Sequence, residues 1–98
     1  MSQSADKSNF KITREYVIQN RYGIHARPAA MLVKTASKFQ SDVTVEKGAV
    51  RVSGKSIMGL MMLAAGPGSK LTIHANGNDG PQAIAEIEAL LKRKFDEE

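Results

Sequence analysis

His25 and Arg27 are the residues whose types and spacing most directly indicate chemistry, and they lie in the segment GIHARPAA, residues 23–30. Imidazole has a reference pKa of about 6.5, so much of it is neutral near pH 7 and able to act as a nucleophile. A guanidinium is permanently charged and presents planar donors that suit phosphate oxygens. His74 is the only other histidine and the sequence has no cysteine, which gives little support to a metal site. The pair indicates phosphoryl transfer onto His25, although a histidine taken alone is more often a structural residue.

A helix is expected to follow His25, over residues 27–39. Pro28 suits a first helical turn because the N–H that it lacks would have no intrahelical partner there. Apolar residues recur with the spacing of an amphipathic helix, at Ala29, Leu32, Val33 and Ala36. Ala26 occupies the expected cap position and has no side-chain oxygen for the free N–H groups, a loss that typically costs about 0.5–2 kcal/mol. Since a bound anion would recover part of this loss, we expect Ala26 and Arg27 to hold a phosphoryl group on His25.

A second segment, GKSIMGLMML at residues 54–63, is expected to form a short apolar helix with Ser56 as its N-cap. The side chains expected to face the core are those of Leu60, Leu63 and Ala64. A two-turn helix on a small domain cannot be buried on all sides, so its other apolar side chains are left outward. These are Met58, Met61 and Met62, with Ile57 at the border. An exposed apolar cluster marks an interaction site and methionine adapts to several partners, although a methionine stripe by itself is more often core.

The two segments, in this order, resemble the HPr family, the histidine-containing phosphocarriers of the sugar phosphotransferase system. The resemblance covers about residues 14–95. It implies that His25 accepts a phosphoryl group from phosphorylated enzyme I, which is charged by phosphoenolpyruvate, and passes it to an enzyme IIA. It also implies that Ser56 is a regulatory site for an HPr kinase/phosphorylase and that the short helix docks partners. Such a relay is a substrate and donor of phosphotransferases and not itself an enzyme, and it needs no cofactor.

Charge and composition favour a protein partner over nucleic acid. The net charge is +4, but aromatic residues make up only 5% of the chain and the basic residues form no long run. Lys34 and Lys38 flank the helix expected after His25, and together with Lys55 they suit an acidic partner. Ile57, Met58 and Met61 are expected to lie at the contact with that partner. The loop at residues 20–23 resembles the nitrogen-related branch of the family, so both a sugar and a nitrogen-related pathway stay open.

Two other functions are compatible with parts of the sequence. A purely regulatory binding module would act through Ser56 while His25 stayed idle, but such a module would not need both His25 and Arg27. A small basic nucleic-acid binder would be retained on DNA in a salt-dependent way. Neither accounts for both segments.

The 98 residues are expected to form one domain over 12–95, between a flexible tail at 1–11 and a short tail at 96–98. Strands are expected at 12–19, on both sides of a turn at Lys47-Gly48, and at 71–75. A last helix is expected to be capped by Asp79 and to carry Pro81 in its first turn. Its expected apolar stripe is Ala83, Ile84, Ile87, Leu90 and Leu91.

The alternation along the strands predicts a sheet with one buried face, and hence an α+β fold of order βαββαβα. The resemblance implies an open-faced β-sandwich, with three helices on one face of a four-stranded antiparallel sheet. His74 is expected on the opposite face beside Thr72, as a solvated surface residue. The polar N-terminus lacks the apolar core of a signal peptide, and the longest apolar run falls far short of the ~20 residues that span a bilayer. We therefore expect a cytoplasmic monomer that binds neither membranes nor nucleic acid.

Overall fold

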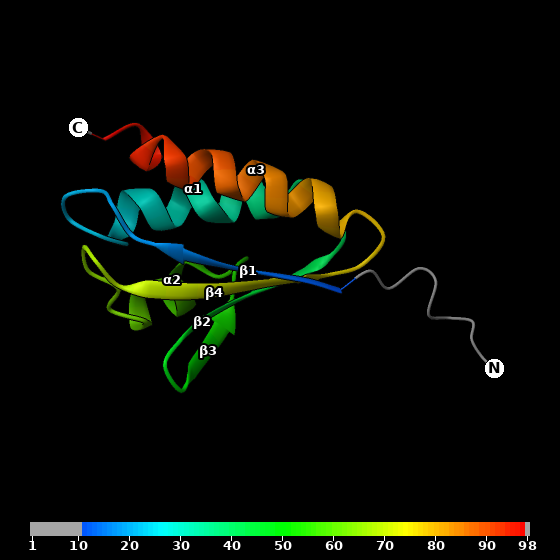
Figure 1. The fold of residues 1–98 in the computed structure, drawn as a ribbon, viewed down its shortest axis with the longest axis horizontal. Helices are drawn as coiled ribbons and strands as arrows, with labels where there is room; N and C mark the ends of the chain where they lie inside the picture. Colours follow the sequence, from blue (N-terminus) through cyan, green and yellow to red (C-terminus); the bar gives the residue numbers. More distant parts are fainter. Residues whose placement is uncertain (1–10, 98) are drawn as a thin grey trace.

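A computed structural model of the chain describes residues 11–97 (Figure 1). The flexible tail expected at residues 1–11 therefore lies outside the described residues, apart from Lys11. The elements in chain order are β1 (Lys11–Val17), α1 (Ala26–Ala36), β2 (Asp42–Lys47), β3 (Val50–Ser53), α2 (Ile57–Met62), β4 (Lys70–Asn76), α3 (Gly80–Lys92) and the short 3₁₀ helix η2 (Lys94–Asp96).

The four strands form one antiparallel sheet in the order β1-β4-β2-β3. Helices α1 and α3 lie side by side over one face of this sheet (Figure 1), and α2 packs against α1 and β3. This confirms the predicted α+β open-faced sandwich and its βαββαβα order. Within residues 11–97, no helix combines the length and apolar character needed to cross a membrane.

The core lies between the sheet and the helices. Alternate residues of β4, Leu71, Ile73 and Ala75, are fully buried, as expected for a strand with one covered face. The α3 stripe predicted from the sequence is buried in full: Ala83, Ile84, Ile87, Leu90 and Leu91. On α1 the buried residues are Pro28, Ala29, Leu32 and Ala36, and Val33 packs at the edge.

Several element ends differ from the prediction. Strand β1 stops at Val17, although Ile18 is buried and exchanges backbone hydrogen bonds with the turn at residues 68–69. Helix α1 ends at Ala36, and the hairpin turn is centred on residues 48–49, with Gly48 at a φ of +59°. The expectation that Ala64 faces the core is wrong. Helix α2 ends at Met62, and the chain leaves it with Ala64 exposed at a φ of +51°.

Asp79 stands at the N-cap position of α3, but the prediction that its side chain caps this helix is wrong. Its carboxylate instead accepts hydrogen bonds from the backbone N–H groups of Gln40 and Ser41, both at 2.9 Å, and from the Ser41 hydroxyl. The bond from the Ser41 hydroxyl, followed by that from the Gln40 N–H, holds the pKa of Asp79 below its usual range. The carboxylate therefore joins the α1–β2 loop to the start of α3.

His74 lies on the open face of the sheet as predicted, but it is not a solvated residue. Its Nδ1 is 3.0 Å from the Thr13 hydroxyl and its Nε2 is 2.8 Å from a carboxylate oxygen of Glu46, and 19% of its side chain is exposed. The sheet register explains this, because Thr13 on β1 lies directly opposite His74. The hydrogen bond with His74 is the main cause that lowers the pKa of Glu46.

Candidate functional site

His25 is the N-cap residue of α1. Its backbone is extended, with φ −101° and ψ −168°, and its side chain makes no capping hydrogen bond. The sequence analysis gave the cap position to Ala26, which is wrong by one residue because Ala26 already belongs to the helix. As expected, therefore, no side chain among the described residues caps the first N–H groups of α1, and the imidazole lies beside them. These groups carry the positive end of the helix dipole, so the position favours an anion.

Tight backbone contacts hold the loop before His25 against the segment that connects α2 to β4. Ile24 donates its backbone N–H to the carbonyl of Ala65 at 2.8 Å. Gly23 has a φ of +71°, and a Cβ at this position would overlap the same carbonyl oxygen. Both the backbone conformation and the close packing at position 23 therefore require glycine. The position of this loop in turn determines where α1 begins.

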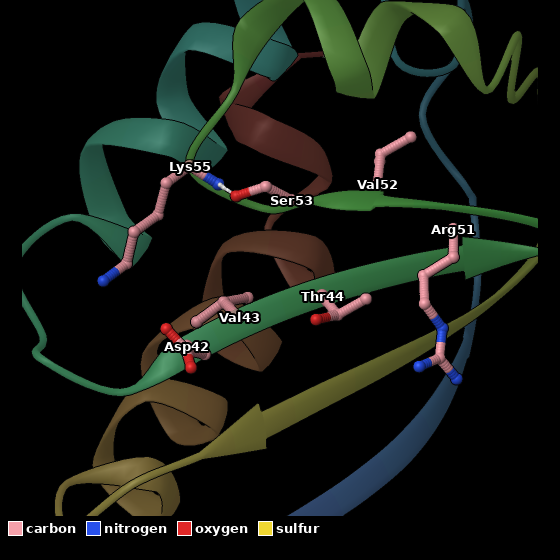
Figure 2. Close-up of a pocket in the computed structure, with 7 residues that line it drawn as sticks. All are labelled: Asp42, Val43, Thr44, Arg51, Val52, Ser53 and Lys55. Atoms are coloured by element: carbon pink, nitrogen blue, oxygen red, sulfur yellow. Dashed lines mark hydrogen bonds between the residues drawn. The ribbon is translucent and has the colours of Figure 1, made fainter.

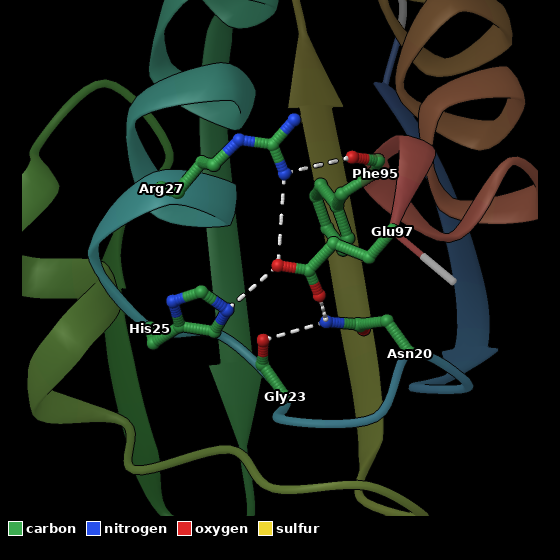
Figure 3. A network of polar contacts seen from close by, with 6 residues as sticks. All are labelled: Asn20, Gly23, His25, Arg27, Phe95 and Glu97. Atoms are coloured by element: carbon green, nitrogen blue, oxygen red, sulfur yellow. Dashed lines mark hydrogen bonds and ion pairs between the residues drawn. The ribbon is translucent and has the colours of Figure 1, made fainter.

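Glu97 brings a carboxylate to His25 that the sequence analysis missed. One of its oxygens lies 2.8 Å from Nε2 of His25 and 3.6 Å from Nη1 of Arg27 (Figure 3). The other oxygen accepts a hydrogen bond of 2.9 Å from the amide of Asn20, which also donates to the Gly23 carbonyl at 2.7 Å. The network joins the loop, the helix start and the C-terminal segment at one point.

The chain brings Glu97 to His25 through an uncommon turn. Lys94, Phe95 and Asp96 all have φ between +55° and +60°, a conformation that costs non-glycine residues roughly 1–2 kcal/mol each. The turn inserts Phe95 into the core with none of its surface exposed, and this burial contributes about 1.5–3 kcal/mol, which offsets part of the cost of the turn. Phe95 therefore anchors the segment that carries Glu97, although residues 96–98 were expected to be a tail.

Glu97 is held as a carboxylate by its neighbours. The hydrogen bond from Asn20 is the largest cause that keeps the pKa of Glu97 below its usual range, and His25 and Arg27 act in the same direction. Only 14% of the Glu97 side chain is exposed, compared with 41% for His25 and 56% for Arg27. The buried edge of the site is therefore negative, and the exposed edge carries the imidazole and the guanidinium.

Two sequence signals could have revealed these missed residues. Asn20 continues the inward-facing series of Tyr16 and Ile18, and it is only 1% exposed. A buried polar residue in such a series needs hydrogen-bond partners. Phe95 lies one helical turn beyond Leu91 in the buried stripe of the last helix, which indicates that the chain stays on the core past Lys92.

Tyr22 forms the outer rim of the site. Its ring meets that of His25 edge-on, with 6.1 Å between the ring centroids, and the guanidinium of Arg21 lies 5.5 Å from the Tyr22 ring. Because 66% of Tyr22 is exposed, a partner that approaches His25 would contact this ring as well.

Ser56 and α2 have the local structure expected of them. The Ser56 hydroxyl accepts a hydrogen bond from the Gly59 N–H at 3.0 Å, which confirms the predicted N-cap. Leu60 is buried beneath the helix. The remaining large apolar side chains are exposed and form what we call the α2 patch: Ile57, Met58, Met61 and Met62.

The three lysines expected to meet an acidic partner do not gather in one place. Lys34 and Lys38 line a depression between α1 and α3, together with Arg93, and Lys38 forms an ion pair with Glu86. Lys55 donates from its ammonium group to the backbone carbonyl of Phe39 at 2.8 Å, beside the start of α2. Only Lys55 is therefore adjacent to the α2 patch.

A separate depression of about 390 Å³ lies along β2 and β3. Its lining, drawn in Figure 2, is Asp42, Val43, Thr44, Arg51, Val52, Ser53 and Lys55. The lining mixes one carboxylate with two cations and includes neither His25 nor Arg27. It shares only Lys55 with the residues that the sequence singled out.

Comparisons with known proteins agree on one family. A family model described as the PTS HPr component phosphorylation site matches residues 12–93. The phosphocarrier protein HPr of Treponema pallidum is 47% identical over 81 residues, which cover 83% of this chain and 92% of that protein.

Two solved structures from Thermoanaerobacter tengcongensis are similar as well. HPr-C-His is 44% identical, with a TM-score of 0.86, and the match covers 89% of this chain and 98% of the HPr-C-His chain. A structure described as an HPr dimer is 45% identical, with a TM-score of 0.70, and the match covers 82% of this chain and 92% of the dimer's chain.

Proposed function

Because the chain belongs to the HPr family of phosphotransferase-system phosphocarriers, we propose that His25 accepts a phosphoryl group from phosphorylated enzyme I and passes it to an enzyme IIA. The observation that carries the proposal is the position of His25 as the N-cap residue of α1, with no capping bond from its side chain. An imidazole at that position is exposed to a partner and has the free N–H groups of the helix beside it.

Nδ1 is the nitrogen that we assign to the phosphoryl group. Nε2 is occupied by Glu97 at 2.8 Å, whereas Nδ1 has no hydrogen-bond partner within residues 11–97 and lies on the side of the first turn of α1 (Figure 3). The phosphoryl oxygens would then be met by the N–H groups that begin at Ala26. The Arg27 side chain is half exposed, and its long contact of 3.6 Å with the Glu97 carboxylate leaves the guanidinium free to turn toward the phosphoryl oxygens.

The α2 patch supports docking of the partner proteins. Met58 and Met62 are exposed to 75% and 73%, and Ile57 and Met61 extend the apolar surface around them. We propose that enzyme I covers this patch together with the rim formed by Tyr22, and that Lys34, Lys38 and Lys55 contact acidic groups of partners. A monomer in the cytoplasm that needs no metal or cofactor of its own fits this role.

Ser56 is proposed as a regulatory site for an HPr kinase/phosphorylase. Its hydroxyl is the cap of α2, so a phosphate there would lie next to the α2 patch. A phosphate adds about −1.5 to −2 charges, and docking would require that this charge lose water against an apolar partner surface. The alternative is a module that acts only through Ser56 and never carries phosphate on His25.

One labelling experiment separates these functions. The protein is incubated with enzyme I and phosphoenolpyruvate, and any acid-labile phosphate is located by peptide mapping. We expect it on His25, lost in His25→Ala and kept in the matched control His74→Ala. Absence of enzyme I-dependent labelling in the wild-type protein would favour the purely regulatory module.

A further inference from the structure

We propose that Glu97, clamped by Asn20, is a positioning residue that keeps the ring proton of His25 on Nε2 and balances the charge of the phosphorylated ring. The idea rests on the proposed phosphocarrier function but concerns a residue outside the two motifs that indicated it. Its basis is the contact of 2.8 Å between the Glu97 carboxylate and Nε2.

The carboxylate is fixed on both of its oxygens. One faces Nε2 of His25, and the other accepts the Asn20 amide at 2.9 Å. Asn20 is itself almost fully buried and tied to the Gly23 carbonyl, while Phe95 anchors the backbone two residues before Glu97. A carboxylate accepts hydrogen bonds and cannot donate one, so Nε2 must carry the proton in this arrangement. The lone pair is then on Nδ1.

The same contact matters during transfer. As the Nδ1 lone pair bonds to phosphorus, the bond between phosphorus and the atom of enzyme I that carried it breaks, and its electron pair stays with that atom. The His25 ring then holds its Nε2 proton and a positive charge, which faces the Glu97 carboxylate. On onward transfer the electrons of the Nδ1–P bond return to Nδ1 and the ring is neutral again. No proton has to leave Nε2 in either direction.

The charged groups that face the ring within residues 11–97 are Glu97 and Arg27, and the Tyr22 ring meets it from outside. Arg27 also reaches toward the Phe95 carbonyl at 3.4 Å. When a phosphoryl group is present, Arg27 can exchange Glu97 for the new oxygens, which leaves Glu97 to the ring alone. In the phosphorylated protein, Arg27 therefore binds the phosphoryl oxygens and Glu97 pairs with the imidazole.

Nitrogen-15 NMR of the unphosphorylated protein tests the first half of the proposal. At a pH where the ring is neutral, wild-type His25 should be the Nε2–H tautomer, and Glu97→Ala should give a mixture of both tautomers. Asp96→Asn is the matched control, because it removes the charge of the neighbouring exposed acid, which pairs with Arg93, and Asn tolerates the positive φ of this turn. An unchanged tautomer in Glu97→Ala would overturn the proposal and leave Glu97 a purely structural contact.

Hydrolysis of the phosphorylated protein tests the second half. Phosphohistidine breaks down through its ring-protonated form, which the carboxylate favours. Glu97→Gln keeps the size but removes the charge, so its phosphohistidine should hydrolyse about two- to fivefold more slowly near pH 7, as for the loss of one partly exposed ion pair. Equal rates in wild type and Glu97→Gln would overturn the charge-balancing role. If enzyme I labelled no histidine, the phosphocarrier function would fail, while the tautomer measurement would still decide the role of Glu97.

Discussion

Substitution of Ser56 separates its role as a helix cap from its proposed role in regulation. The hydroxyl accepts the Gly59 N–H at 3.0 Å, so Ser56→Ala leaves that donor without its partner. Loss of an N-cap typically costs about 1 kcal/mol of unfolding free energy. Asp caps about as well as Ser, so Ser56→Asp should be as stable as the wild-type protein.

Transfer from enzyme I should follow a different order. Ser56→Asp places a negative charge beside Ile57 and Met58, and we expect the concentration of protein needed for half-maximal transfer to rise about two- to fivefold, as for one unfavourable surface charge. Ser56→Ala adds no charge and should transfer like the wild type. The mimic should be milder than phosphoserine, which carries more charge.

Two measurements on the same three proteins test this reasoning. Urea unfolding gives the stability order, in which only Ser56→Ala is weakened. Initial rates of His25 phosphorylation against protein concentration give the transfer order, in which only Ser56→Asp is weakened. Equal concentration dependence in all three proteins would leave Ser56 as a helix cap and nothing more.

Two further predictions concern the α2 patch and the acid stability of the fold. Replacing both Met58 and Met61 with Asp should weaken transfer from enzyme I while changing the unfolding free energy by no more than about 0.5 kcal/mol per site, because both side chains are exposed. Val50→Asp on β3 is the control at an exposed apolar residue outside the patch, and unfolding of the double variant would show that the methionines belong to the core. The pKa of Asp79 is lowered in the folded protein, so its contribution to stability is present above its unfolded pKa of about 3.9 and is lost as the pH falls through the folded value. Urea unfolding between pH 7 and pH 2 should therefore show a smaller acid loss in Asp79→Asn than in the wild type, and identical pH profiles would contradict the bonds from Gln40 and Ser41.

Local patterns were enough to predict the four strands and the three α-helices of this fold. The 3.6-residue spacing on the segments that became α1 and α3 identified their buried faces, and alternation along β4 placed Leu71 and Ile73 inward. The exposure of the α2 patch followed from the shortness of that helix. These features depend on residues close together in the sequence, which is why they could be read from it.

Apart from the local errors at Ala26 and Ala64, the errors lie where a distant segment supplies the partner. Asp79 has the right position for a cap, but two N–H groups from the α1–β2 loop take its carboxylate. His74 is covered because the sheet register brings Thr13 and Glu46 to it, and the register was not predicted. Glu97 reaches His25 only through the turn with positive φ at residues 94–96, which no local propensity favours.

The position of the phosphoryl group is the most direct test of the central claim. After incubation with enzyme I and phosphoenolpyruvate, phosphorus-31 and nitrogen-15 NMR of the intact protein identifies the nitrogen that carries the phosphorus. We predict a single phosphohistidine at Nδ1 of His25, with the proton kept on Nε2 next to Glu97. Phosphate on Nε2 of His25, on His74 or on no histidine would contradict this account of the site.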